Sequence, residues 1–155
     1  MSTDDRDGLL AALGSAMQLS TSRAVFFHQA MAAHVGINVT DFNCLNILIM
    51  EGPLTVGGLA ERCGLTKGGA ITTSVDRLQK AGLVLRQRDP ADRRKVIVRH
   101  TDDAIARIMP LLVRFTADWA AILNGYPDDE LRVLLDYTER SNIAAYSATV
   151  RLQQA

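Results

Sequence analysis

The chain has 155 residues, 48% of them hydrophobic and 22% charged, a composition typical of one folded domain and not of a disordered segment. Seventeen basic residues balance seventeen acidic ones, so the net charge by itself says nothing about a polyanionic partner. The acidic N-terminus lacks the pattern of a secretory signal, and no apolar run approaches the roughly 18 residues of a membrane span, so we expect a cytoplasmic protein with no membrane partner.

The N-terminal third predicts two helices. Residues 7–34 are rich in alanine and precede Gly36, a residue suited to end a helix. The apolar residues of this first helix lie on more than one side, which indicates burial against a second subunit. Thr40 or Asp41 is placed to cap a second helix that reaches Met50.

The middle of the chain predicts two further helices separated by a tight turn. Residues 56–63 form the first of them, and residues 64–66 form the turn, in which the glycine can take a positive φ. Thr66 can cap the next helix, over residues 67–81, which ends at Gly82.

Two strands and two long helices complete the chain. Residues 83–87 and 96–100 predict an antiparallel hairpin, Thr101 caps a helix that reaches Leu123, and a last helix runs from Pro127 to about Leu152. The order of helix, glycine-containing turn, helix and hairpin is that of a winged helix-turn-helix, whose second helix fits a major groove. The predicted fold class is therefore mainly α with a small β-hairpin wing (α+β).

Positive charge is concentrated in this part of the chain. From Arg62 to Arg99 there are ten basic and three acidic residues, a local net charge of +7, and the remainder carries −7. Such an asymmetry is typical of a surface that contacts phosphates, although a solvated face can show it as well.

The second of the two middle helices begins with an unusual pair of glycines. Gly68 and Gly69 would each cost about 1 kcal/mol relative to alanine inside a helix. Close approach to DNA is one explanation, and a sharp entry into the helix is the other. The sequence leaves both open.

The stretch GPLTVGGLAERCGLTKGGAITTSVDRLQKAGLVLRQRDPADRRKVIVRHT, residues 52–101, closely resembles the core of the MarR family of bacterial transcription regulators. The resemblance implies one domain of that type over residues 1–155. Within it, residues 1–36 and 102–155 would form a helical dimerisation layer, and residues 37–101 the winged helix-turn-helix lobe.

The resemblance also implies a function. Family members are typically homodimeric repressors that bind a palindromic operator in double-stranded DNA and are released by small ligands, often phenolic or otherwise aromatic. The sequence shows no nucleophile and base pairing, metal signature or phosphate-binding loop, so we expect no enzyme, cofactor or metal.

The family pattern assigns roles within the wing. Its arginine enters the minor groove and its aspartate orients the guanidinium, positions that correspond here to Arg94 and Asp92, with phosphate contacts from Arg93 and Lys95 on either side. The recognition-helix candidates for DNA contact are Thr66, Lys67, Gly69, Thr72 and Thr73, with Arg77 next to the DNA backbone.

Other sites are suggested less directly. An effector cleft would be lined by His28, Met31, Asn46 and Phe115, each of which is also suited to the core or a dimer interface.

Three alternatives stay open beside the ligand-responsive regulator. One is a winged-helix module that binds an acidic protein; the others are regulators that respond to thiol oxidation or to a metal. Cys44 and Cys63 fit core positions, and His28 and His34 point about 120° apart on a helix, so neither sensing mode has a matching pattern.

Overall fold

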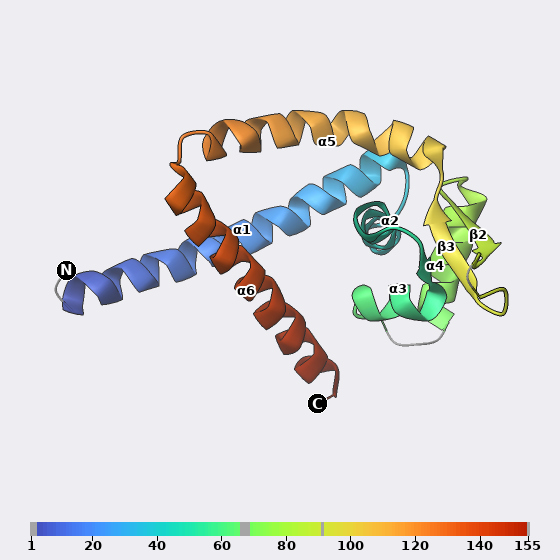
Figure 1. Cartoon of the computed structure of the whole chain (residues 1–155), viewed down its shortest axis with the longest axis horizontal. Coiled ribbons are helices and arrows are strands. Elements are labelled where there is room, and N and C mark those ends of the chain that lie inside the picture. The colour runs from blue at the N-terminus through green and yellow to red at the C-terminus, as the bar shows by residue number, and fades with distance from the viewer. Residues whose placement is uncertain (1–2, 66–68, 91, 155) are drawn as a thin grey trace.

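The computed structural model describes residues 3–65, 69–90 and 92–154 (Figure 1). Its helices are α1 (Thr3–Val35), α2 (Val39–Glu51), α3 (Val56–Arg62), α4 (Gly69–Lys80), α5 (Asp102–Leu123) and α6 (Asp128–Gln154), and its strands are β1 (Leu54–Thr55), β2 (Val84–Arg88) and β3 (Val96–His100). The mainly α fold with a small antiparallel sheet agrees with the prediction.

Most helix ends follow the local signals in the sequence. Gly36 directly follows α1 and has a φ of 79°, and Gly82 lies two residues beyond the end of α4 and has a φ of 75°; glycines with positive φ are common where helices end. The Thr101 hydroxyl accepts a hydrogen bond from the N–H of Ala104 (3.2 Å) and begins α5, which confirms the predicted cap. Thr66, the predicted cap of α4, lies outside the described residues.

The predicted start of α2 is wrong. The cap is Asn38, not Thr40 or Asp41: its backbone is extended and its side-chain oxygen accepts a hydrogen bond from the N–H of Asp41 (2.9 Å). Asp41 therefore lies within the first turn of the helix, where its carboxylate is free to bond elsewhere. In a similar way, α1 begins at Thr3 and not at Asp7, because acidic residues extend its first turn.

The sheet has the strand order β1, β3, β2, and both pairs are antiparallel. Val98 of β3 lies opposite Leu54 on one side and Arg86 on the other. β2, β3 and the turn that joins them form the wing, with β2 displaced by one residue from its predicted range.

The hydrophobic core lies in the lobe formed by α2, α3, α4 and the sheet, at one end of the molecule in Figure 1. Leu45, Leu59 and Leu78 are fully buried there. α1 contributes Met31 and Ala32 from its last turns, and α5 contributes Ala104 and Ile108 from its first turns. The lobe is thus packed against one end of each of these two long helices.

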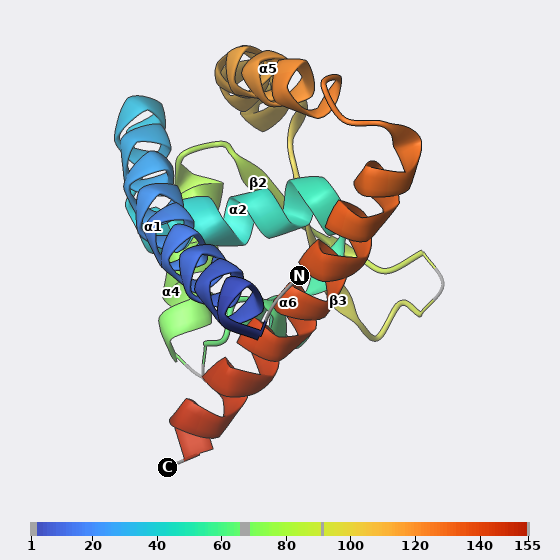
Figure 2. The same ribbon diagram turned by 90° about the vertical axis from the view of Figure 1, so that its left-hand side faces the viewer.

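The long helices α1, α5 and α6 extend beyond the lobe (Figures 1 and 2). They expose many apolar side chains. On α6, a hydrogen bond from Tyr137 Oη to Met17 Sδ (3.0 Å) connects it with α1. Apolar residues between 49% and 68% exposed include Leu9, Leu10, Leu13, Met17, Trp119, Ile122, Val133, Leu135 and Ile143. Patches of this kind mark surfaces that another molecule covers.

Over the part of the chain that the structure describes, no helix combines the length and the apolar character that crossing a membrane requires.

Candidate nucleic-acid interface

Helix α4 has one buried and one exposed face. Ile71, Ser74, Val75 and Leu78 are buried against the lobe. The exposed face carries three of the predicted DNA-contact residues, Gly69, Thr72 and Thr73, together with Ala70. Lys67, like Thr66, lies outside the described residues. The small and hydroxylated side chains leave the backbone of α4 open to close approach.

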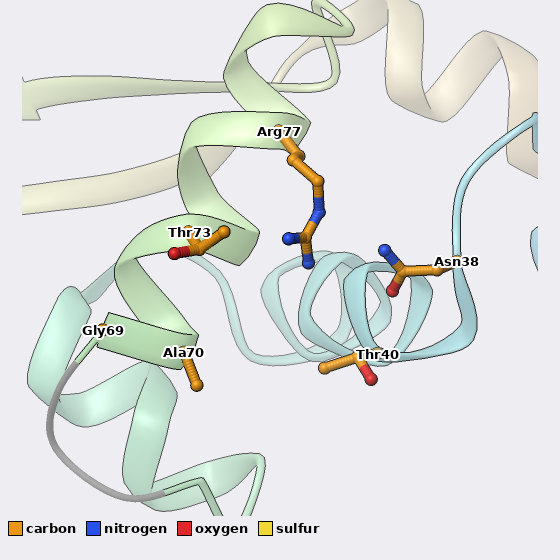
Figure 3. A pocket seen from close by; sticks show the side chains of 6 residues that line it. All are labelled: Asn38, Thr40, Gly69, Ala70, Thr73 and Arg77. Atoms are coloured by element: carbon orange, nitrogen blue, oxygen red, sulfur yellow. The ribbon is translucent and has the colours of Figure 1, made fainter.

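A hollow of about 550 Å³ lies between this face and the start of α2 (Figure 3). The side chains that line it are Asn38, Thr40, Gly69, Ala70, Thr73 and Arg77. In Figure 3 the Arg77 side chain extends from α4 toward α2, and Asn38 lies on the opposite side of the hollow.

Among the described residues, nothing in the conformation or the surroundings of Gly69 requires a glycine. It is not among the glycines with positive φ, and a Cβ added at this position would meet no atom within 4 Å. The backbone of Gly69 itself thus shows no sharp turn, and close approach to DNA stays a prediction. Gly68 lies outside the described residues.

Arg77 is bound to α2 by a bidentate ion pair. Its guanidinium donates from Nε to Asp41 Oδ2 (2.7 Å) and from Nη2 to Asp41 Oδ1 (2.6 Å). The carboxylate of Asp41 is buried, with 2% of the residue exposed. The pKa of Arg77 is raised, chiefly by this hydrogen bond, so the guanidinium stays charged.

Two further side chains complete the coordination of Asp41. Ser74 Oγ donates to Oδ1 from the buried face of α4, and Asn38 Nδ2 donates to Oδ2 (2.8 Å). Residues from α2 and α4 thus share one buried carboxylate, which fixes how α4 lies on the lobe. Arg77, predicted next to the DNA backbone, has this structural role; its contact with DNA stays a prediction.

Asp41→Ala is expected to lower the free energy of unfolding by about 1.5–3 kcal/mol, the usual contribution of hydrogen bonds to a charged group. The reason is that Ser74 and Asn38 both lose their acceptor. Urea denaturation of the two proteins measures the difference. Asp136→Ala, which removes an exposed carboxylate paired with Arg140 on α6, is the control and should change stability little.

The turn of the wing is organised by Asp92. Its Oδ1 accepts a hydrogen bond from the backbone N–H of Arg94 (3.1 Å), its carbonyl accepts from the N–H of Lys95 (2.9 Å), and Oδ2 lies 3.8 Å from Lys95 Nζ. The resemblance implies that Asp92 orients the guanidinium of Arg94. In this structure the carboxylate contacts the backbone of Arg94 instead, because the two residues are neighbours in a tight turn.

The exposed cations of the wing are Arg88, Arg93, Arg94 and Lys95, and Arg93 and Arg94 are the two whose side chains have no partner among the described residues. Arg86, in contrast, is paired with Asp76 (2.6 Å), and Arg88 donates to the carbonyl of Arg93 (2.8 Å). Within the residues that the structure describes, no ion pair involves the side chain of Arg93 or Arg94, and both are exposed. These two cations are therefore available to a polyanion.

The four predicted effector-cleft residues are only partly brought together. His28 bonds to Asn43 through Nδ1 (3.0 Å), and the Phe115 ring stacks on Phe27 with a centroid distance of 4.4 Å. The Phe27 ring lies 6.2 Å from that of His28 and so connects the two. Met31 belongs to the core, at 5% exposed.

Asn46, the fourth of these residues, donates a hydrogen bond to Met50 Sδ (3.6 Å). A common cleft stays a prediction.

The structure also brings together the two cysteines, which the sequence treats as separate core residues. Cys63 Sγ lies 3.3 Å from Cys44 Sγ. A spacing of nineteen residues carries no signal for such a contact, since Cys44 lies on α2 and Cys63 directly follows α3. Among the described residues, no three histidine, cysteine or acidic side chains are grouped so that they could hold a metal ion.

The fold and this surface define a class of protein. Helices α3 and α4, with α4 open on one face and a cationic wing beside it, form a winged helix-turn-helix of the kind that binds DNA. A model described as the MarR family matches residues 35–95. The HTH-type transcriptional regulator YcgE of Bacillus subtilis (strain 168) is 33% identical over 133 residues, which cover 86% of each chain. The chain belongs to the MarR family of transcriptional regulators.

Solved structures agree on the fold. A MarR family protein from Bacillus stearothermophilus has a TM-score of 0.65 at 24% identity and covers 90% of this chain and 96% of its own. NadR, in a complex with 4-hydroxyphenylacetate, has a TM-score of 0.64 at 18% identity and covers 83% of this chain and 90% of its own.

Proposed function

We propose that the protein is a homodimeric repressor that binds a palindromic operator through α4 and the wing. The observation that carries this proposal is the open face of α4 next to two exposed arginines of the wing, for which the described residues provide no ion-pair partner. In this arrangement α4 enters the major groove, where Gly69, Thr72 and Thr73 lie nearest the bases. Arg94 enters the adjacent minor groove, and Arg93 and Lys95 contact phosphates.

A second copy of the chain supplies the partner in this proposal. The exposed apolar residues of α1, α5 and α6 support it, because they are too numerous for a free surface. The dimer would place two α4 helices in successive major grooves, roughly 34–36 Å apart. Since the operator lies in bacterial DNA, we place the protein in the cytoplasm. A DNA-binding regulator needs no enzymatic activity, and we assign none to this chain.

The test is selection of bound fragments from genomic DNA, followed by fluorescence-anisotropy titration of the best fragment at several salt concentrations. Affinity should fall steeply with salt, because each phosphate contact releases a counterion. A plot of the logarithm of the binding constant against the logarithm of the salt concentration should have a slope of about −0.9 per phosphate contacted. If the selection enriched no fragment, the proposal would be contradicted. That outcome would favour the alternative in which the basic wing binds an acidic protein.

A small aromatic effector is part of the proposal. The stacked rings of Phe27 and Phe115 and the edge contact of His28 with Phe42 (5.6 Å) offer an aromatic surface between the long helices and the lobe. The phenolic ligand of NadR supports this ligand class for a chain of similar fold.

Gly69→Ala is expected to weaken binding to the selected fragment while the free energy of unfolding stays equal or rises. The added methyl group has open space within the chain but would meet the DNA. Gly8→Ala is the matched control, because Gly8 is also helical with open space around it but lies in α1. Equal affinity of Gly69→Ala and the wild type would show that α4 does not approach the bases at this position.

Asp92→Ala is expected to weaken binding as well, although it removes a negative charge next to DNA. The reason is that Asp92 fixes the backbone at Arg94 and Lys95, and a loose turn loses more entropy on insertion. Anisotropy titration at fixed salt measures the change. A variant that binds more tightly than the wild type would mean that Asp92 acts only through its charge.

A further inference from the structure

Cys44 and Cys63 form a thiol pair at the junction of three helices. They are the two cysteines of the chain, both are free, and their Sγ atoms are 3.3 Å apart. A disulfide bond is about 2.05 Å long, so the sulfurs would have to approach by roughly 1.2 Å. The two groups are therefore in contact but not bonded.

The two cysteines differ in how firmly they are held. Cys44 is fully buried on α2. Cys63 is partly exposed and directly follows the last residue of α3, where its N–H donates to the carbonyl of Leu59 (2.9 Å). Gly64 comes next, with a positive φ of 62°. A closing movement would thus be made by Cys63 and Gly64, directly after the end of α3.

The pair is also chemically asymmetric. The pKa of Cys44 is lowered, chiefly because its sulfur accepts a hydrogen bond from Cys63. The same hydrogen bond, together with burial, raises the pKa of Cys63. Cys44 is therefore the more acidic of the two thiols, and the thiolate is the reactive form of cysteine. Cys63 is the partly exposed member of the pair.

A chain of contacts leads from the thiols to α4. Cys44 Sγ lies 4.0 Å from Ser74 Oγ, Ser74 donates to Asp41, and Asp41 holds Arg77. Arg77 and Thr73 line the hollow at the exposed face of α4 (Figure 3). A change at the sulfurs thus acts on α4 through its buried hydrogen bonds.

We propose that Cys44 and Cys63 form a reversible disulfide within the chain, and that this bond lowers the affinity of the α4 surface for DNA. The first part stands on the geometry of the pair alone. The second part rests on the proposed function.

A hydroperoxide supplies the oxidant. The thiolate attacks the O–O bond, so that an S–O bond forms, the O–O bond breaks and water or an alcohol leaves with a proton. The second thiol then attacks the sulfur of this sulfenic acid, which forms the S–S bond and expels water. In sum, two thiols lose two electrons and two protons to the peroxide. A dithiol reductant reverses the change by exchange.

The first experiment treats the reduced full-length chain with one equivalent of hydrogen peroxide. Thiol titration of the denatured protein should fall from two groups to none, and the mass should decrease by two hydrogen atoms, with recovery in dithiothreitol. Sulfinic acids, or a disulfide between two chains on a non-reducing gel, would overturn the proposal. Cys63→Ser, a substitution at a partly exposed position, should form no disulfide within the chain.

The second experiment measures DNA affinity, by anisotropy on the selected fragment, before and after oxidation. The oxidised wild type should bind at least about fivefold more weakly, the lower end of ordinary coupling between sites. Cys63→Ser should bind equally well with and without peroxide. Equal affinity of the reduced and oxidised wild type would overturn the coupling to α4. Failure of the reduced protein to bind any fragment would contradict the proposed function, while the thiol and mass measurements would still decide the disulfide.

Discussion

Arg94→Ala is expected to weaken binding to the operator by about 2–6 kcal/mol, because a lost arginine contact costs about 1–3 kcal/mol and a symmetric dimer carries two wings. The side chain is exposed at the tip of the wing, without an ion pair among the described residues, so its charge is free to enter a groove. A narrow minor groove concentrates negative potential and attracts an arginine. Fluorescence-anisotropy titration measures the loss.

Two control variants separate the position of the charge from its amount. Arg107→Ala removes an equally cationic residue from α5, where it is paired with Asp103 (2.7 Å), and should leave the affinity almost unchanged. Arg94→Lys keeps the charge but loses the planar guanidinium, and its affinity for the operator should lie between those of Arg94→Ala and the wild type. If Arg94→Ala and Arg107→Ala bound equally well, the wing would not insert into DNA.

Ile143→Glu is expected to break the dimer. Ile143 is 68% exposed on α6, and burying a side chain of this size contributes about 1.5–3 kcal/mol. Because a symmetric interface contains the residue twice, the free energy of dimer association should weaken by about 3–6 kcal/mol. The cost of burying a carboxylate adds to this loss. Sedimentation velocity of the wild type and the variant measures the change in association.

Met50→Glu is the matched control for this prediction. Met50 is 77% exposed, but it lies on α2 in the lobe, where we propose no second copy. The same substitution there should leave the sedimentation coefficient unchanged. Dissociation of both variants, or of neither, would contradict a dimer interface on α6.

Much of the candidate site could be predicted from the sequence because its determinants are local. The glycine and the threonines of α4 lie on its exposed face as helical spacing requires, and the wing turn lies where Pro and Asp separate the two strands of the hairpin. Arg77 shows the limit of this reasoning. Its spacing from Ile71 and Leu78 correctly predicts an exposed position, but it does not reveal the buried acceptor that holds the guanidinium.

The start of α2 shows the same limit at short range. Asn38, Thr40 and Asp41 are all good caps by residue type. The carboxylate of Asp41 accepts hydrogen bonds from Ser74 and Arg77 of α4, so it does not cap the helix, and Asn38 does. A contact from another helix thus decides a feature that is local in appearance.

By itself the sequence determined the order of the elements, the helix ends at Gly36 and Gly82, the cap at Thr101 and the family, since each depends on residues a few positions apart or on one contiguous motif. Only the tertiary structure decided that Asp41 binds Arg77, 36 residues away, and that Cys44 meets Cys63. The physical reason is that helical periodicity specifies which side of a helix is buried. It does not specify which side chain of another helix will be found there.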